Sequence, residues 1–510
     1  MKNIGPRSRC LGWLRGPIPV LLLATLTASA LVSAEYAATW ESLDSRPTPE
    51  WFLDAKLGIF IHWGVYSVPA YAYPDSYSEW YWHSLREPLE GRNERQRRNA
   101  LATREFHNRV YGERFIYPQF APEFKAELFD PEQWADLFRK AGARYVVLTS
   151  KHHDGFALWP SKDANRTWGR PWNSVDEGPR RDLLGDLGSA VRDAGLKMGF
   201  YYSLYEWFNP LWLQDSDRYI QEHMIPQFKD VVSRYRPALI FSDGEWDLEH
   251  ERWQSTELLA WLFNESPGRD EVVINDRWGK GIRHKHGGYY TTEYGAGMAD
   301  ATHAWEENRG IGHSFGYNRN EPIANYMTAK QLVWVLVDLV SRGGNLLLDV
   351  GPTADGRIPL LQQQRLLELG AWLEVNGEAI HGTRPWRTPA QWTAGERPVQ
   401  EYKQYRQQYD ILRVAGLEPD GDVARKMVFF TRKGADLYAI LPGFPSEPVT
   451  LEGVSAPTGA RVTMLGSSAD LEWRPSQAGL RVTPPVIAPD ELPCRHAFVF
   501  KIAGGAASSE

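Results

Sequence analysis

Short apolar runs alternate with amphipathic segments of helical period between residues 57 and 375, and this alternation restricts the possible fold more than any other feature. Runs of this length that are apolar on both faces are typical of strands buried in a parallel sheet. The eight expected strands are at residues 57–64, 145–149, 197–202, 238–241, 271–274, 287–293, 304–307 and 345–350. Strands that alternate with helices form βαβ units. We therefore predict an α/β fold, a (β/α)8-like TIM barrel.

The segments between these runs have the apolar period of helices. The expected helices are at residues 131–140, 182–196, 215–235, 256–263, 326–341 and 360–375. Pro131 fits the first turn of its helix, where a missing N–H has no consequence. Residues 84–125 are strongly charged, with Arg92 and Arg95 among several basic residues. We interpret this stretch as an excursion over the surface.

The sequence pattern changes near residue 387. Helical periodicity stops, and short β-type runs separated by turn residues follow at 426–430, 436–441, 461–465, 479–482 and 498–502. Such spacing is typical of an antiparallel β-sandwich. We predict a catalytic barrel over residues 35–386, a C-terminal β-sandwich domain over 387–505 and a disordered tail at 506–510.

The first 34 residues have the three parts of a secretory signal peptide. Basic residues stand at the start, residues 17–32 are apolar, and Val32-Ser33-Ala34 fits a small-residue cleavage site. An uncleaved membrane anchor is the alternative, but the apolar run is short and rich in Ala, Ser and Thr. We expect cleavage after Ala34, no membrane attachment afterwards, and a secreted or periplasmic protein, or a lysosomal one in a eukaryotic host.

Charge and cysteine content constrain the mature chain. Removing four basic and no acidic residues with the leader changes the formal net charge from −7 to −11. An acidic surface argues against nucleic acid as a partner. Cys10 lies in the leader, so Cys494 remains alone and no disulfide can form within the mature chain.

Polar side chains gather where the predicted strands end. Asp243, in Ser242-Asp243-Gly244, follows a buried run, and His62, Arg277 and Glu293 hold comparable places. In α/β barrels the carboxyl ends of the strands carry the chemistry, although a lone Asp-Gly is also typical of a helix cap. Two carboxyl groups hydrolyse a glycosidic bond, and imidazole, guanidinium and aromatic groups bind sugars. The chain has 22 Trp, which fits a sugar site without proving one.

Two other interpretations apply to single residues. His152 and His153 could be a metal pair, but neighbouring residues on a strand point to opposite faces. His284 and His286 have chelating spacing, yet they lie in a Gly-rich loop. Glu79 could be a solvated loop charge. We predict no metal and no cofactor.

Nine segments together resemble the α-L-fucosidases of glycoside hydrolase family twenty-nine, in particular the animal lysosomal type. They are WFLDAKLGIFIHWGVYSVP (51–69), SEWY (78–81), KHHDGF (151–156), FYYSLYEWF (200–208), SDGEW (242–246), NDRWG (275–279), HGGYY (286–290), SFGY (314–317) and NLLLDVGP (345–352). They occur in family order over the predicted barrel, and the C-terminal part resembles the family's sandwich. The resemblance implies hydrolysis of terminal α-L-fucose from fucosylated glycans.

The resemblance also implies residue roles. Asp243 corresponds to the nucleophile, and Glu293, in Thr-Thr-Glu-Tyr, to the acid/base, with Glu306 as the other candidate. Fucose-binding positions correspond to His62, Glu79, Trp80, His152, His153, Tyr202, Arg277 and Phe315. Tyr201 is the neighbouring alternative to Tyr202. The implied mechanism is retaining, with a covalent fucosyl-enzyme intermediate.

Other functions remain open from the sequence. A fucose-binding protein of the same fold with weak or no catalysis is one, although Asp243 is present. An exported glycosidase for a related sugar, or a metal-dependent hydrolase, is another. A homo-oligomer is possible.

Overall fold

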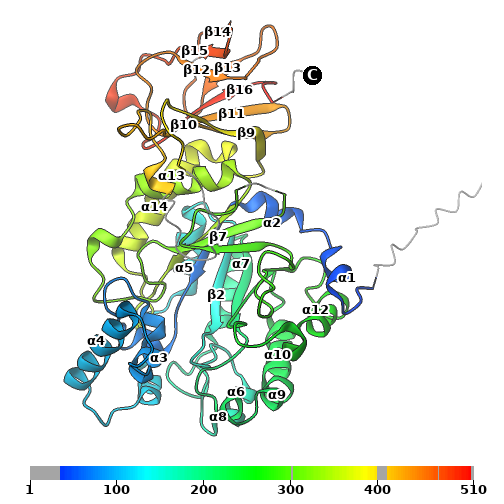
Figure 1. The fold of residues 1–510 in the computed structure, drawn as a ribbon, viewed down its shortest axis with the longest axis vertical. Coiled ribbons are helices and arrows are strands. Elements are labelled where there is room, and N and C mark those ends of the chain that lie inside the picture. The colour runs from blue at the N-terminus through cyan, green and yellow to red at the C-terminus, as the bar shows by residue number, and fades with distance from the viewer. Residues whose placement is uncertain (1–34, 300–301, 399–410, 469, 507–510) are drawn as a thin grey trace, which may run out of the picture. The chain divides into compact units, whose positions relative to one another are not determined.

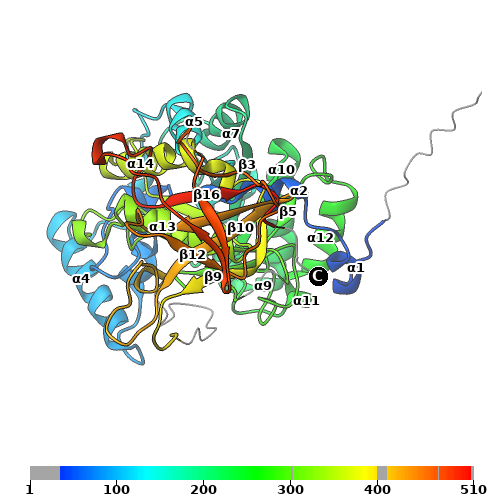
Figure 2. The ribbon, with the colours of Figure 1, turned by 90° about the horizontal axis from the view of Figure 1, so that it is seen from above.

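The computed structural model describes residues 35–299, 302–398, 411–468 and 470–506, and Figures 1 and 2 show them from two sides. The predicted leader at 1–34 and the last four residues of the predicted tail lie outside the described residues. The described residues from Tyr36 onward form one compact unit. Within the described residues, no helix has both the length and the apolar character needed to cross a membrane.

An eight-stranded parallel sheet curls into a barrel and confirms the predicted fold class. Its strands are β1 (Leu57–Ile61), β2 (Tyr145–Lys151), β3 (Lys197–Ser203), β4 (Leu239–Asp243), β5 (Val273–Ile274), β6 (Tyr290–Glu293), β7 (Trp305–Gly310) and β8 (Asn345–Val350). Their order is β5-β4-β3-β2-β1-β8-β7-β6. The two edge strands approach each other where the Tyr289 amide donates to the Ile274 carbonyl oxygen at 3.1 Å.

The strands are buried on both faces, as their continuous apolar sequences predict. Phe60, Tyr201 and Phe241 belong to the cluster that fills the barrel interior, whereas alternate residues pack against the outer helices. Gly58 pairs with Tyr145 across β1 and β2. A Cβ atom at Gly58 would lie 2.3 Å from the Tyr145 ring, so only glycine fits there.

Most outer helices match the predicted ranges. They are α5 (Pro131–Lys140), α7 (Leu183–Asp193), α10 (Ile225–Tyr235), α12 (Ser255–Asn264), α13 (Ala329–Ser341) and α14 (Leu360–Asn376). The helix predicted at 215–235 is confirmed, because a continuous helical run extends from Ser216 to Tyr235. It consists of α9 (Ser216–Tyr219), a π-helical turn (Ile220–Met224) and α10. Pro226 has no amide hydrogen to donate to the preceding turn, which explains the π-helical turn within this helix.

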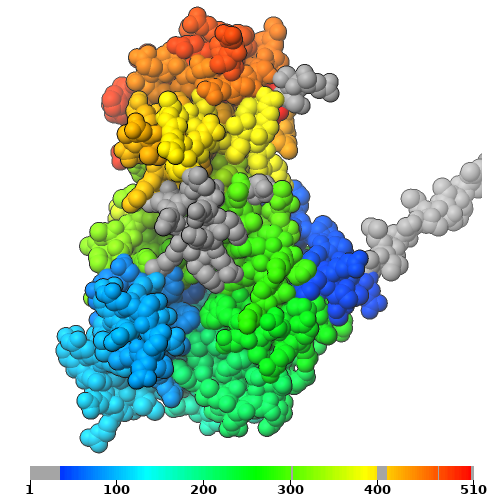
Figure 3. Space-filling view, viewed as in Figure 1, coloured from blue at the N-terminus to red at the C-terminus, as the bar shows by residue number. Residues whose placement is uncertain are grey.

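The charged stretch at 84–125 is more ordered than the predicted surface excursion. It contains the second half of α3 (Tyr81–Arg86), all of α4 (Glu94–Val110) and a 3-10 segment (Tyr117–Glu123). A capping box between Asn93 and Gln96 starts α4. Phe106 and His107 on α4 are buried, with Phe106 stacked on Tyr71 and His107 hydrogen-bonded to Tyr81 of α3. Figure 3 shows this region as a blue lobe on the left of the molecule.

Two antiparallel sheets form the C-terminal part, as predicted. The strands are β9 (Arg384–Trp392), β10 (Lys426–Lys433), β11 (Asp436–Leu441), β12 (Val449–Glu452), β13 (Val462–Met464), β14 (Trp473–Ser476), β15 (Gly479–Val482) and β16 (Phe498–Ile502). The sheets have orders β13-β16-β11-β10-β9 and β12-β15-β14. Strand β9 crosses the boundary expected between residues 386 and 387.

The β-domain packs on α13 and α14, where Figures 1 and 2 show its strands. Trp334 on α13 donates its indole hydrogen to the His496 carbonyl oxygen at 2.9 Å, and Trp372 on α14 does the same to Ala497 at 2.9 Å. Lys426 forms an ion pair with the buried Asp338 of α13. Cys494 is a free thiol in the described part of the chain.

Candidate active site

A cavity of about 460 Å³ opens at the carboxyl ends of the barrel strands, and we name it the catalytic cavity. Eight of the predicted site residues line it: His62, Glu79, Trp80, His152, Asp243, Arg277, Glu293 and Phe315. They come from positions between residues 62 and 315, so the barrel gathers side chains that are far apart in sequence. A site of this size is typical of a small-ligand pocket.

Asp243 is the last residue of β4 and is 8% exposed. Arg277 Nη1 donates to Asp243 Oδ1 at 2.9 Å, and the Tyr201 hydroxyl donates to Oδ2 at 3.0 Å. Burial acts to raise the pKa of Asp243, but the Arg277 charge, a hydrogen bond from His153 and the Arg283 charge hold that pKa well below its usual range. Asp243 is therefore an ionised carboxylate in a nearly dry setting.

Gly244 explains how the chain leaves the site directly after Asp243. Its φ of +78° is in the left-handed region, and a Cβ atom there would lie 2.5 Å from the Tyr205 ring. Glycine is the residue that accepts both conditions. The turn leaves Asp243 at the end of its strand, so the helix-cap interpretation of this residue is wrong.

Glu293 is the last residue of β6. Its Oε2 accepts from Arg277 Nη2 at 3.3 Å, and its Oε1 accepts from the Tyr77 hydroxyl at 3.4 Å. Burial raises the pKa of Glu293 above its usual value; Arg277 opposes this effect and the Asp243 charge adds to it. A carboxyl of this kind keeps its proton at a pH where Asp243 is ionised.

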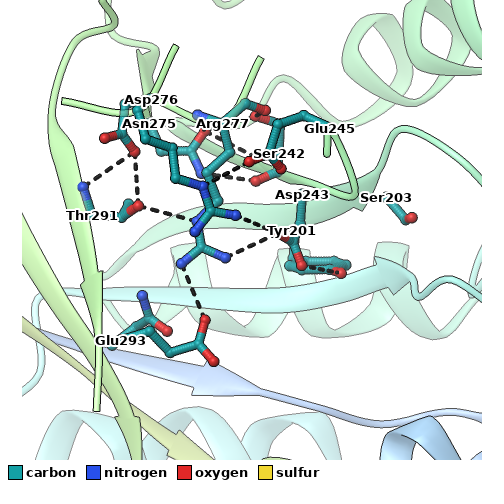
Figure 4. Close-up of polar contacts among 12 residues, drawn as sticks. Tyr201, Ser203, Ser242, Asp243, Glu245, Asn275, Asp276, Arg277, Thr291 and Glu293 are labelled. Carbon is teal, nitrogen blue, oxygen red and sulfur yellow. Dashed lines mark hydrogen bonds and ion pairs between the residues drawn. The ribbon is translucent and has the colours of Figure 1, made fainter. Parts of the chain in front are cut away.

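One guanidinium therefore joins the two carboxyl groups, as Figure 4 shows. Arg277 is itself held in place because its Nε donates to Thr291 Oγ1 at 3.0 Å. The Thr291 hydroxyl donates in turn to Asp276 Oδ1 at 2.7 Å. Two carboxyl groups in one cavity with pKa values shifted in opposite directions are typical of an acid–base pair.

Glu79 is a third carboxyl in the cavity and is only 2% exposed. Its Oε2 accepts from the Gly316 amide at 2.9 Å and from the Ser314 hydroxyl at 3.4 Å. Burial raises its pKa to about 8, because these hydrogen bonds only partly offset the loss of water. The interpretation of Glu79 as a solvated loop charge is wrong.

Three histidines surround the carboxyl groups. His62 Nδ1 and Asp349 Oδ1 share a hydrogen bond of 2.7 Å, and burial lowers the pKa of His62 to about 3. The rings of His152 and His153 are 4.2 Å apart, so the expectation that they point to opposite faces is wrong. Strand β2 ends at Lys151, and the alternation of a strand does not apply beyond it.

Aromatic rings complete the walls. Phe315 stacks on His62 with ring centroids 4.8 Å apart, and Trp80 stacks on Trp246 at 5.9 Å. Faces of this kind suit the C–H surface of a sugar ring, whereas the carboxyl and imidazole groups suit its hydroxyls.

The structure corrects the choice of Tyr202 as a site residue. The Tyr202 hydroxyl donates to Gln227 Oε1 at 2.9 Å and lies close to the Met224 carbonyl oxygen, on the side of the outer helices. Tyr201 points into the barrel and contacts Asp243. Adjacent strand residues alternate between faces, so a shift of one position exchanges the two environments.

The structure also places Glu306 away from the catalytic cavity. Glu306 is the second residue of β7, at the amino end of the strand, and it is fully buried. The Tyr145 hydroxyl donates to Glu306 Oε2, and burial raises the pKa of Glu306 to about 8. Asn308, two residues further along β7, lines the cavity instead.

Four contributors to the site have no counterpart among the sequence predictions. Tyr77, Arg283, Asn308 and Asp349 contact or neighbour the predicted residues. Tyr77 directly precedes the SEWY segment and Asp349 lies inside NLLLDVGP, so both stand beside recognisable motifs. Arg283 Nη2 lies 3.5 Å from Asp243 Oδ1, and its Nε donates to Glu245 Oε1 at 2.6 Å. Arg283 comes from the long connection after β5, where no sequence motif indicates a site residue.

His284 and His286 bind separate partners. His286 Nδ1 lies 2.7 Å from Asp44 Oδ2, and His284 Nε2 lies 2.7 Å from the Thr291 carbonyl oxygen. Across the ranges that the structure describes, no three His, Cys, Asp or Glu side chains converge as metal ligands do.

Comparisons with known proteins point to one family. Residues 23–378 match the family model described as alpha-L-fucosidase, and residues 421–503 match that of the alpha-L-fucosidase C-terminal domain. The chain is 40% identical over 497 residues to an alpha-L-fucosidase of Branchiostoma floridae, covering 95% of this chain and 99% of that protein. It is 40% identical over 521 residues to the human tissue alpha-L-fucosidase, covering 99% of this chain and 100% of that protein.

A solved structure is similar over nearly the whole chain. It is the alpha-fucosidase of Thermotoga maritima in complex with a mechanism-based inhibitor. The TM-score is 0.73 and the sequence identity 37%, and the match covers 92% of this chain and 100% of the other.

Proposed function

This chain belongs to the alpha-L-fucosidase family and hydrolyses terminal α-L-fucose, and we propose that Asp243 is its nucleophile and Glu293 its general acid/base. The observation that carries these roles is the pair of opposite pKa shifts on two carboxyl groups that share Arg277. A nucleophile must be ionised, and an acid must hold a proton at the same pH.

In the first step, Asp243 attacks the anomeric carbon of fucose. The bond from that carbon to the leaving oxygen breaks, and the oxygen takes the proton of Glu293. A covalent fucosyl-enzyme and an ionised Glu293 result. Arg277 then faces a neutral ester at Asp243 and a carboxylate at Glu293, so one cation stabilises the negative charge before and after the step.

In the second step, Glu293 removes a proton from water, which attacks the anomeric carbon. The ester bond to Asp243 breaks, and both carboxyl groups return to their starting states. This sequence requires the two carboxyl groups to be about 5–5.5 Å apart, close enough for direct attack by Asp243. Asp243 and Glu293 accept hydrogen bonds from the two terminal nitrogens of the same Arg277 guanidinium, which supports such proximity.

The remaining cavity residues bind and orient the sugar. Burial keeps His152 neutral by lowering its pKa, and its Nδ1 has no hydrogen-bond partner among the described residues. A buried polar atom of this kind is expected to have a partner in the working complex, and a fucose hydroxyl would supply one. Phe315 and Trp80 supply the apolar faces for the ring.

We also propose that the protein is exported and acts on fucosylated glycans outside the compartment of its synthesis. The leader pattern at residues 1–34 supports this proposal.

The stereochemistry of hydrolysis tests the two-step mechanism. We expect ¹H NMR of an α-L-fucoside digest to show α-L-fucose as the first product, with the β anomer appearing later by mutarotation. Two inversions at the anomeric carbon give this result. β-L-fucose as the first product would indicate a single displacement by water and would contradict the role of Asp243.

A further inference from the structure

A second cavity, of about 580 Å³, adjoins the catalytic cavity, and we name it the side cavity. Tyr77, Trp80, Arg95 and Trp246 line both cavities. The outer wall comes from α3 and α4, the region that the sequence pattern indicated only as a surface excursion. We propose that the side cavity binds the leaving group of the substrate, and that it is built for a neutral saccharide.

The position of Tyr77 connects the side cavity to the chemistry. The leaving oxygen must lie at Glu293, because that residue supplies its proton under the proposed function, on which this inference rests. The Tyr77 hydroxyl donates to Glu293 at 3.4 Å, and Tyr77 also lines the side cavity. A substituent on the leaving oxygen therefore has a route past Tyr77 into this space.

The lining groups suit sugar hydroxyls. His83 on α3 is a neutral imidazole, since burial lowers its pKa to about 4, and it presents one donor and one acceptor. Gln96 on α4 uses its carbonyl oxygen in the capping box. Within the described ranges, no hydrogen bond occupies the Gln96 amide hydrogens or the His83 ring nitrogens. Trp80 and Trp246 form an aromatic wall next to these groups.

Charge and polarity argue against other leaving groups. A lipid needs a continuous apolar wall, whereas α4 presents Asn93, Gln96 and Asn99 to the cavity. An anionic group needs excess positive charge. The lining holds two arginines, Arg92 and Arg95, and two carboxyl groups, Glu87 and Asp247, so it has no excess of either charge; Arg92 is paired with Glu87 at 3.1 Å. An uncharged molecule with many hydroxyls fits both observations.

The test compares two substrates that share fucose and differ in the leaving group. One is 2′-fucosyllactose, which releases a neutral disaccharide, and the other is 4-nitrophenyl α-L-fucoside. The variants are His83→Phe, which keeps an aromatic ring against Trp80, and Gln96→Glu, which keeps the capping acceptor but removes the amide donor. In each variant we expect the ratio of kcat/KM for fucosyllactose to kcat/KM for the aryl fucoside to fall about tenfold.

Gln331→Glu is the matched control, because Gln331 holds the same capping-box position on α13 and lines neither cavity. Its substrate ratio is expected to equal that of the wild type. The proposal is overturned if neither pocket variant changes the ratio by more than about twofold, or if the control lowers it equally. It is also overturned if the wild type hydrolyses the aryl fucoside but not fucosyllactose. Failure of the wild type on both fucosides would instead contradict the fucosidase function.

Discussion

Replacing Asp243 by glycine is expected to lower kcat for α-L-fucosides by at least about three powers of ten. The variant has no group that can form the ester intermediate, while Arg277 and Arg283 keep their positive charges beside the empty space. Azide is a small anion that those charges attract. We expect added azide to restore part of the rate and to yield β-L-fucosyl azide, because it attacks from the side that Asp243 occupied.

Asp243→Asn is the matched control for this experiment. The amide fills the space that azide would need, so we expect the same loss of rate without rescue. Both variants should retain the wild-type melting behaviour within a few degrees, as measured by differential scanning fluorimetry. Near-native turnover in Asp243→Gly, with or without azide, would remove Asp243 from the mechanism.

Replacing Glu293 by alanine is expected to slow hydrolysis in proportion to how much the leaving group needs a proton. For a fucosyl oligosaccharide, kcat/KM should fall by about 10² to 10⁴-fold. For an aryl fucoside with an acidic phenol the fall should be far smaller, because that phenolate leaves unaided. The comparison uses kcat/KM because it reports the first chemical step, whereas loss of the base also slows the second.

The pH profile gives an independent readout of Glu293. Its pKa is raised in the folded protein, and only the protonated form can donate, so wild-type activity falls as pH rises through that pKa. In Glu293→Ala this alkaline limb of kcat/KM should disappear. The acidic limb should remain, because it reports protonation of Asp243, whose pKa is lowered.

Glu306→Gln is the matched control for Glu293, since Glu306 was the other acid/base candidate. Glutamine imitates the protonated carboxyl that a pKa of about 8 implies at neutral pH. We expect equal effects on the two substrates and an intact alkaline limb. If Glu306→Gln alone showed the leaving-group dependence, the assignment of Glu293 would be wrong.

The barrel was predictable because the sequences of β1, β2, β4 and β8 are mostly apolar on both faces. Such sequences indicate strands that are buried on both sides of a sheet. Strand β7 was predicted too short. Its charged residues Glu306 and Glu307 are buried and have hydrogen-bond partners from other strands, as in the hydrogen bond that the Tyr145 hydroxyl donates to Glu306. A local pattern does not contain such long-range compensation.

Site residues were predictable where a recognisable short motif coincides with the carboxyl end of a predicted strand. Asp243 and Glu293 are each the last residue of a strand, so their positions marked them as candidates, whereas their roles came from the family resemblance. The choice between Tyr201 and Tyr202 depends on strand register, which a motif match leaves open by one residue. Arg283 reaches Asp243 only through the path of the long connection after β5, and that path is a property of the folded chain.

Trapping the fucosyl-enzyme tests the central claim most directly. A 2-deoxy-2-fluoro-fucosyl fluoride should react readily and release slowly, because the fluorine destabilises both transition states and the fluoride leaves without an acid. After digestion, mass spectrometry should find one added fluorofucosyl group on the peptide that contains Asp243, and none in Asp243→Gly. A label on Glu293, on Glu79 or on any other residue, or hydrolysis with no trapped intermediate, would contradict the account.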